Sequence, residues 1–205
     1  MQLSDFEPPF YFSPGDYSKI LADLQEQDPQ LKVLFSAVPN VDYENILKEP
    51  YPALVGAIIG QRIKYLTAKE YRKTIYSTLG INFHPIEFLS NISLFSDRIP
   101  KEILENIIRV SNFILENFID LSTNPSKLLE CPGVGNWTLT TMILSSTLLK
   151  YNLDLFPFED VFIRNRIQQL YNLESKPNKK QLEEIIKKWS PYRSIVTWHL
   201  WRFNI

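Results

Sequence analysis

The stretch CPGVGNWTLTTMIL, residues 131–144, places two glycines between a proline and an apolar run that is long enough to form a helix. Gly133 and Gly135 permit the backbone conformations and the close approach that a tight hairpin needs. Such a hairpin exposes backbone N–H groups beside a helix N-terminus, which suits a phosphate oxygen. Two interpretations follow from this stretch alone: a simple turn between two helices, or a backbone grip on an anion.

The chain around this hairpin is predicted to be all-helical. Strand-like alternation is nearly absent, whereas apolar residues recur at three- and four-residue spacing. Residues 53–79 predict two helices joined by a polar bend at GQRIKYLT, and Asp28-Pro29 predicts a helix start before the apolar group at 31–35. Further helices, punctuated by prolines, are expected at 101–118, 137–150, 160–171, 179–189 and 192–203.

Composition narrows the class of protein. The 205 residues are 44% hydrophobic and 22% charged, as in ordinary globular proteins, and no apolar run approaches the length of a membrane span. The only cysteine is Cys131, which excludes a disulfide framework, an iron–sulfur cluster and a Cys-based zinc site within one chain. The N-terminus lacks the basic start and apolar stretch of a signal peptide, so we expect an intracellular protein.

The net charge of −1 argues against a simple nucleic-acid coat protein, but the charges are unevenly distributed. Residues 1–50 carry 3 basic and 9 acidic side chains, whereas residues 121–205 carry 11 basic and 7 acidic ones. The C-terminal portion could therefore face an anion while the N-terminal portion faces water.

Two further stretches carry side chains that chemistry could use. In FPFEDVFI, Asp160 stands just before a predicted helix, where it either caps that helix or stabilises a developing positive charge. In WSPYRSIVTWHLW, Trp198 and Trp201 lie three residues apart on one helix, where they are either core residues or stacking surfaces. The sequence of each stretch leaves both alternatives open.

In their order along the chain, ILADLQEQDPQL, YPALVGAIIGQRIKYLTAKEY, CPGVGNWT, FPFEDVFI and WSPYRSIVTWHLW resemble the helix-hairpin-helix DNA glycosylase superfamily, specifically its 3-methyladenine DNA glycosylase II branch. The resemblance runs from about Ile20 to Phe203. It implies an all-α fold of two helical lobes, with the active site in the cleft between them. The central domain would span residues 51–155 and include the helix-hairpin-helix, and residues 1–50 plus 156–205 would form the second lobe.

The resemblance also assigns roles to individual residues. Asp160 falls on the essential aspartate, and the bend Gln61-Arg62 falls where relatives fill the gap left by an extruded nucleotide. Tyr192 and Arg193 would stabilise the closing helices. The remaining assignments are the phosphate-binding residues Gly133, Gly135, Asn136 and Thr138, the base-pocket residues Trp137, Trp201 and Thr141, and the main-chain carbonyls of Leu129, Cys131 and Val134, which would help to coordinate a monovalent cation such as Na⁺ or K⁺.

Trp137 carries a mechanistic implication. Relatives that also cut the DNA strand place a lysine at this position, and Trp137 has no amine to form a Schiff base. The resemblance therefore implies a monofunctional DNA glycosylase of base excision repair. It would flip N-alkylated purines, of the 3-methyladenine or 7-methylguanine type, out of damaged double-stranded DNA and release them by hydrolysis. It would act as a monomer, without a required cofactor and without a membrane.

Three alternatives remain at this point. The first is a non-catalytic helix-hairpin-helix DNA-binding protein, which has no need of an acid at Asp160. The second is a glycosylase for oxidised or mismatched bases, whose lyase and iron–sulfur versions Trp137 and the missing cysteines disfavour. The third is a helical scaffold with a chance PGVG turn, which leaves the ordered set of motifs unexplained.

Overall fold

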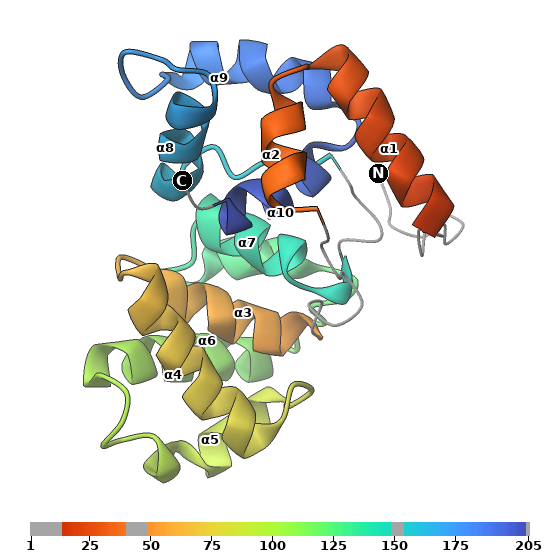
Figure 1. Cartoon of the computed structure of the whole chain (residues 1–205). Coiled ribbons are helices and arrows are strands. Elements are labelled where there is room, and N and C mark those ends of the chain that lie inside the picture. Colours follow the sequence, from red (N-terminus) through yellow and green to blue (C-terminus); the bar gives the residue numbers. More distant parts are fainter. Residues whose placement is uncertain (1–13, 40–48, 149–153, 204–205) are drawn as a thin grey trace. The chain divides into compact units, whose positions relative to one another are not determined.

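A computed structural model of the chain describes residues 14–39, 49–148 and 154–203. These residues form helices and connecting turns, and none of them lies in a β-strand, which confirms the predicted all-α class. The chain divides into two compact units, one made of Met1–Tyr43 with Leu149–Ile205 and the other of Glu44–Leu148 (Figure 1). No helix in the described ranges has the length and apolar character that a membrane span requires.

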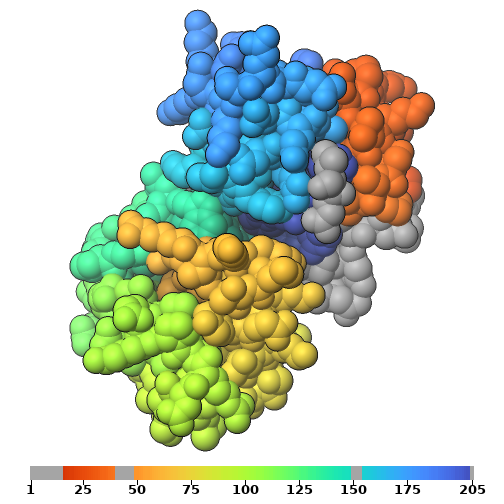
Figure 2. Space-filling model, turned by 60° about the vertical axis from the view of Figure 1, so that its left-hand side comes forward, coloured from red at the N-terminus to blue at the C-terminus, as the bar shows by residue number. Residues whose placement is uncertain are grey.

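The unit Glu44–Leu148 is organised around α3 (Pro50–Gly60). Every residue of this helix from Pro50 to Ile59 is buried, because α4 (Tyr65–Leu79), α6 (Lys101–Glu116) and α7 (Asn136–Leu144) all pack against it. A helix that is apolar on all sides belongs in the centre of a bundle. Figure 2 shows α4, in yellow, beside the green residues of the following helices, which include α5 (Pro85–Ser90).

Two glycines of α3 let α4 come unusually close. A Cβ atom on Gly56 would lie 2.5 Å from the hydroxyl oxygen of Tyr76, and one on Gly60 would lie 2.8 Å from Nη2 of Arg72. The Tyr76 hydroxyl donates to the carbonyl of Pro52 at 2.9 Å, and burial raises the pKa of this tyrosine to about 12. The missing side chains of α3 therefore make room for two polar side chains of α4.

The other unit joins the two ends of the described chain. Its helices are α1 (Pro14–Gln27), α2 (Leu31–Ala37), α8 (Val161–Leu170), α9 (Lys179–Ile186) and α10 (Arg193–Arg202). They enclose one apolar core, which comprises Ile20, Leu24, Leu31, Leu34, Phe35, Phe156, Ile163, Ile167, Leu170, Leu182, Ile186, Trp189, Ile195, Val196, Leu200 and Phe203.

Asp28 is a buried carboxylate that links several elements around this core. Its carboxylate is buried and accepts hydrogen bonds from the Tyr171 hydroxyl and, at 3.0 Å, from Nε1 of Trp189. The ammonium of Lys188 lies 3.9 Å away, and the Gln30 amide donates to the other carboxylate oxygen at 3.3 Å. Burial, together with Asp28, raises the pKa of Tyr171. A buried carboxylate is tolerated because donors from several elements surround it.

Most predicted helices are present, and the largest difference from the predicted bounds is the end of α7. The sequence predicted a helix over 137–150, but α7 ends at Leu144. The Ser145 amide makes the last helical bonds, to the carbonyls of Thr141 and Met142, and the Ser146 amide and hydroxyl then both bond to the carbonyl of Ile143. Serine competes with helix continuation by forming such local bonds.

The WSPYRS motif has a structural role in the described structure. The guanidinium of Arg193 pairs with Asp154 through contacts of 2.7 and 2.5 Å, and the Ser190 hydroxyl donates to the same carboxylate at 3.0 Å. Burial by itself would raise the pKa of Asp154, but the hydrogen bonds from Arg193 and Ser190 outweigh it and lower that pKa. These contacts fix the start of α10 on the segment that precedes Asp160.

Candidate functional site

The PGVG stretch forms a hairpin between η3 (Pro125–Glu130) and α7. The Cys131 amide bonds to the carbonyl of Leu128 at 3.0 Å, and the Val134 amide bonds to the carbonyl of Cys131 at 3.1 Å. Gly133 has a φ of 89°, a conformation that L side chains rarely adopt, so this position needs glycine. The hairpin is therefore a turn in which the backbone conformation at Gly133 requires glycine.

The N-terminus of α7 has no side-chain cap. Gly135 is the N-cap residue, and the first backbone bond of the helix runs from the Leu139 amide to the Gly135 carbonyl at 3.0 Å. The amides of the first turn, which begins at Asn136, thus have no acceptor within the helix. A Cβ atom on Gly135 would meet no atom within 4 Å beyond its chain neighbours, so the N-cap position itself is open. This end of α7 can accommodate an anion.

The bend that follows α3 holds the hairpin. Nε2 of Gln61 donates to the Gly133 carbonyl at 3.0 Å and to the Thr138 hydroxyl oxygen at 2.8 Å. Thr138 is buried, and its hydroxyl oxygen is already occupied by the bond from Gln61. Arg62, the next residue of the bend, is exposed and has a φ of 57°. Gln61 thus supports the hairpin in this structure, and Arg62 is the member of the pair that reaches outward.

Arg109 of α6, which is not among the predicted site residues, also contacts the hairpin. Its Nη1 donates to the Pro132 carbonyl at 3.3 Å and lies 3.1 Å from the place where a Cβ on Gly133 would be. Its side chain is exposed, so the guanidinium adds a positive charge beside the amides of α7. An exposed arginine on an amphipathic helix carries no sequence pattern that distinguishes it from its neighbours.

The three carbonyls predicted to coordinate a cation also belong to the hairpin. Neutral carbonyl oxygens in a turn are hard donors and suit a hard cation. The Cys131 carbonyl also accepts from the Val134 amide, and the thiol of Cys131 is buried, which raises its pKa. The described ranges contain no group of three or more His, Cys, Asp or Glu side chains that could hold a metal ion.

Trp137 and Thr141 lie one turn apart on α7 and are both half-buried. The Trp137 ring approaches α3, with Cη2 3.4 Å from the position of a Cβ on Gly60. The Thr141 hydroxyl oxygen is buried and has no hydrogen-bond partner among the described residues. An aromatic face next to a hydroxyl that still lacks a partner could bind a planar, polar ligand.

Asp160 is the N-cap of α8, as one of the two interpretations of FPFEDVFI predicted. Its Oδ1 accepts from the Ile163 amide at 3.0 Å, and its Oδ2 accepts from Nε1 of Trp201 at 3.3 Å. The residue is only 6% exposed. Both carboxylate oxygens are thus held in place, and the carboxylate sits in a largely desolvated position where electrostatic interactions are stronger than in water.

Trp201 and Trp198 of α10 occupy different environments. Trp198 is buried, and the guanidinium carbon of Arg202 lies 4.3 Å from the centre of its ring. Trp201 is half-buried, contacts the Trp198 ring edge-on with centroids 5.6 Å apart, and donates to Asp160. Trp198 is therefore a core residue, whereas Trp201 combines an accessible ring with a bond to the candidate catalytic carboxylate.

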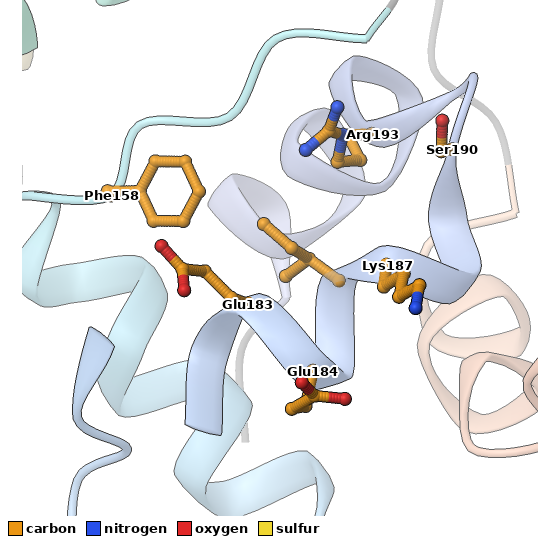
Figure 3. Close-up of a pocket in the computed structure, with 7 residues that line it drawn as sticks. Phe158, Glu183, Glu184, Lys187, Ser190 and Arg193 are labelled. Atoms are coloured by element: carbon orange, nitrogen blue, oxygen red, sulfur yellow. The ribbon is translucent and has the colours of Figure 1, made fainter. Parts of the chain in front are cut away.

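The predicted site residues fall into two groups, one in each unit. The unit Glu44–Leu148 contains the hairpin, the bend and the α7 residues, and the unit formed by the chain ends contains Asp160 and Trp201. A surface pocket in the latter unit is lined by none of them. Figure 3 shows Glu183 of α9 extending toward Phe158 there, and the other lining residues are Glu184, Ile186, Lys187, Ser190 and Arg193.

Proteins of similar sequence are named as alkylbase glycosylases. YfjP of Bacillus subtilis, whose name assigns DNA-3-methyladenine glycosylase provisionally, is 32% identical over 106 residues, which are 48% of this chain and 36% of that protein. The match thus spans about a third of that relative. DNA-3-methyladenine glycosylase 1 of Schizosaccharomyces pombe is 25% identical over 89% of this chain and 84% of its own. No family model matches the sequence.

The fold also has solved counterparts. The 3-methyladenine DNA glycosylase Mag1 of Schizosaccharomyces pombe, solved in complex with abasic DNA, aligns with a TM-score of 0.72 at 20% identity. The alignment covers 90% of this chain and 95% of that one. The chain therefore has the helix-hairpin-helix DNA glycosylase fold and has homologues that are named 3-methyladenine DNA glycosylases.

Proposed function

We propose that this chain is a monofunctional DNA glycosylase that releases N-alkylated purines from damaged duplex DNA in base excision repair. The observation that carries the proposal is Asp160, a largely desolvated carboxylate whose two oxygens are held by the Ile163 amide and the Trp201 indole. The homologues named as 3-methyladenine DNA glycosylases support the same reaction. It would act inside the cell, where its substrate is.

The hairpin is the proposed binding site for the DNA backbone. The amides at Gly133, Gly135, Asn136 and Thr138 would bind phosphate oxygens, since the N-terminus of α7 has no side-chain cap and the Cβ position of its N-cap residue Gly135 is open. Arg109 would add charge at the same place. Phosphate contacts position the strand without reading its sequence, which suits an enzyme that must act anywhere in the genome.

A base inside a duplex is out of reach, so the damaged nucleotide must be flipped out at a cost of a few kcal/mol. The exposed Arg62 would fill the vacated space, while Gln61 keeps the bend attached to the hairpin. The flipped base would bind against an aromatic face, for which Trp137 in one unit and Trp201 in the other are the candidates. Thr141 lies one turn from Trp137 on α7, where its unpaired hydroxyl could bond to the base.

Breaking the N-glycosidic bond leaves positive charge on the sugar. The Asp160 carboxylate would stabilise that charge or orient the water that attacks C1′. An alkylated purine such as 3-methyladenine carries a positive charge and leaves as a neutral base, so no general acid is needed. Because position 137 is a tryptophan, no Schiff base forms, and the product is an intact strand with an abasic site.

A monovalent cation would serve the hairpin rather than the reaction. The carbonyls of Leu129, Cys131 and Val134 would hold Na⁺ or K⁺ and so fix the turn that presents the amides. The chemistry at C1′ requires no other metal or cofactor in this proposal.

The test is base release from methylated duplex DNA, followed by chromatography of the freed bases. The native protein should release methylpurines, and Asp160→Asn should release at least 100-fold less while binding DNA as tightly. Glu159→Gln is the matched control, because it removes the neighbouring exposed carboxylate and should leave release unchanged. Full activity of Asp160→Asn would refute the mechanism. Tight binding to an abasic-site analogue without any release would instead indicate a non-catalytic or different-lesion protein.

A further inference from the structure

Arg72 of α4 occupies a place that the glycines of α3 create. Its Nε donates to the Gly56 carbonyl at 2.9 Å, and its Nη2 lies 2.8 Å from the position of a Cβ on Gly60. The Nε bond fixes the plane of the guanidinium, and the absence of a side chain on Gly60 lets Nη2 reach the end of α3. The bond at Nε thus fixes the position of the Arg72 guanidinium.

The charge of Arg72 has no carboxylate partner among the described residues. Its terminal nitrogens make no hydrogen bond there either, since Nε carries the one bond that the side chain forms. The side chain is half-buried, and burial lowers the pKa of the guanidinium. The C-terminal dipole of α3 offsets part of the cost of this arrangement. The bond to the Gly56 carbonyl uses only Nε, so the N–H groups of Nη1 and Nη2 can still donate to a ligand.

The ring of Trp137 borders the same glycine. Its Cη2 lies 3.4 Å from the Gly60 Cβ position that Nη2 of Arg72 also approaches. The guanidinium and the indole therefore meet over Gly60. A base that stacks on Trp137 would present an edge toward a fixed set of N–H donors.

We propose that Arg72 determines which purines the pocket accepts, by donating to the carbonyl oxygen at C6 of the base. This inference rests on the proposed function, in which Trp137 stacks the flipped base. Guanidinium groups carry N–H donors and no acceptor. Guanine-type bases and hypoxanthine present an acceptor at C6, whereas adenine-type bases present an amino donor. Arg72 would therefore favour 6-oxo purines such as 7-methylguanine over 6-amino purines such as 3-methyladenine.

The first measurement uses one sample of methylated DNA, which contains both bases. Both are cations before release, so the general effect of a nearby positive charge cancels in their ratio. Arg72→Gln should lower the release of 7-methylguanine about tenfold and leave that of 3-methyladenine within about twofold, because one good base contact discriminates by a factor of about this size. Arg98→Gln, which removes an exposed arginine of the same unit, is the charge-matched control and should leave the ratio unchanged.

Arg72→Gln also removes the Nε bond to the Gly56 carbonyl, so this variant could be less stable than the native protein. A second variant therefore moves the guanidinium and keeps the arginine. Gly60→Ala would place a methyl group 2.8 Å from Nη2 and displace the guanidinium while its charge is kept. The ratio of 7-methylguanine to 3-methyladenine should fall in this variant as well. An unchanged ratio in a folded Arg72→Gln protein, with release intact, would overturn the inference and leave the proposed function standing.

A binding measurement separates the two proposals completely. In the Asp160→Asn background, fluorescence anisotropy would compare a duplex that carries hypoxanthine with one that carries unsubstituted purine, which lacks the C6 oxygen. We expect about tenfold tighter binding of the hypoxanthine duplex, and no preference once Arg72→Gln is added. If the preference is present although the native protein releases no base, the proposed function fails and the role of Arg72 stands. If Arg72→Gln does not alter the preference, the role of Arg72 fails.

Discussion

The N-terminal ends of α7 and α8 are built in opposite ways. α7 follows Gly135, which has no side chain to cap it, whereas α8 follows Asp160, whose carboxylate accepts from the Ile163 amide at 3.0 Å. The end of α9 is different again, with a reciprocal capping box between Asn178 and Gln181. Side-chain caps are the exception among the described helices, since α2, α3, α4, α5, α6 and α10 also begin without one.

The two candidate functional ends would offer different groups to a substrate. The α7 end leaves its amides to an external acceptor, and open space lies in front of Gly135. The α8 end is capped by a carboxylate that also binds Trp201, so the cap holds a charged group in a defined orientation. One helix end would therefore bind substrate, and the other would position a catalytic group.

The largest expected effect separates the two tasks of Asp160. Asp160→Asn and Asp160→Ala should both reduce base release at least 100-fold, because both remove the charge. Only Asp160→Ala should lower the free energy of unfolding, by about 1 kcal/mol, since an asparagine oxygen can still cap α8. Single-turnover release and urea denaturation measure the two quantities. Equal destabilisation of both variants would mean that the carboxylate charge, and not the cap, stabilises this end.

The next prediction converts the α7 end into a capped one. Gly135 has extended backbone angles (φ −115°, ψ −179°), so Gly135→Asp fits the backbone and can accept from the first-turn amides. We expect DNA affinity to fall roughly thirtyfold, because the carboxylate occupies the amides and repels phosphate, while stability stays constant or rises slightly. Anisotropy at fixed salt with an abasic-site duplex measures the affinity. Unchanged affinity would show that the hairpin does not grip the DNA.

A smaller effect is expected when the second contact of Asp160 is removed. Trp201→Phe keeps an aromatic ring and deletes the N–H that lies 3.3 Å from Oδ2. The carboxylate would then lose the bond that orients Oδ2 from α10, so kcat should fall about tenfold with little change in the affinity for duplex DNA. Rapid-quench kinetics at saturating DNA isolate kcat. A loss of affinity without a loss of kcat would place Trp201 in the base pocket only.

The smallest effect distinguishes the two glycines of the hairpin. Gly133→Ala should lower the free energy of unfolding by about 1 to 2 kcal/mol, because φ at this position is 89° and Arg109 lies close by. Gly135→Ala is the matched control and should be nearly neutral for stability, because nothing lies within 4 Å of its new methyl group. Thermal unfolding followed by circular dichroism compares them. Equal melting temperatures would contradict the assignment of the turn to Gly133.

The sequence could predict the elements whose signals are local. The regular apolar face of residues 101–118 predicted α6, and Asp160 before an apolar-periodic run predicted the cap of α8. The early end of α7 depended on how Ser145 and Ser146 bond to nearby carbonyls, which periodicity does not indicate.

The contacts of the candidate site were less accessible to sequence reasoning, because they join distant residues. Trp201 donates to a carboxylate 41 residues earlier, and Gln61 donates to a carbonyl 72 residues later. Nothing in the spacing of either side chain specifies such a partner. The resemblance to a family supplied the identities of these residues, but it did not predict that Gln61 would support the hairpin or that Arg72 and Trp137 would meet over Gly60.

The anchoring of Asp28 has a consequence for synthesis on the ribosome. Its donors Tyr171 and Trp189 are made 143 and 161 residues later, so α1 and α2 emerge long before the groups that bond to this carboxylate. The unit Glu44–Leu148 is continuous in sequence and can complete its contacts while the remainder is still being translated. We therefore expect the hairpin-bearing unit to fold first, and the N-terminal helices to dock only when translation is almost complete.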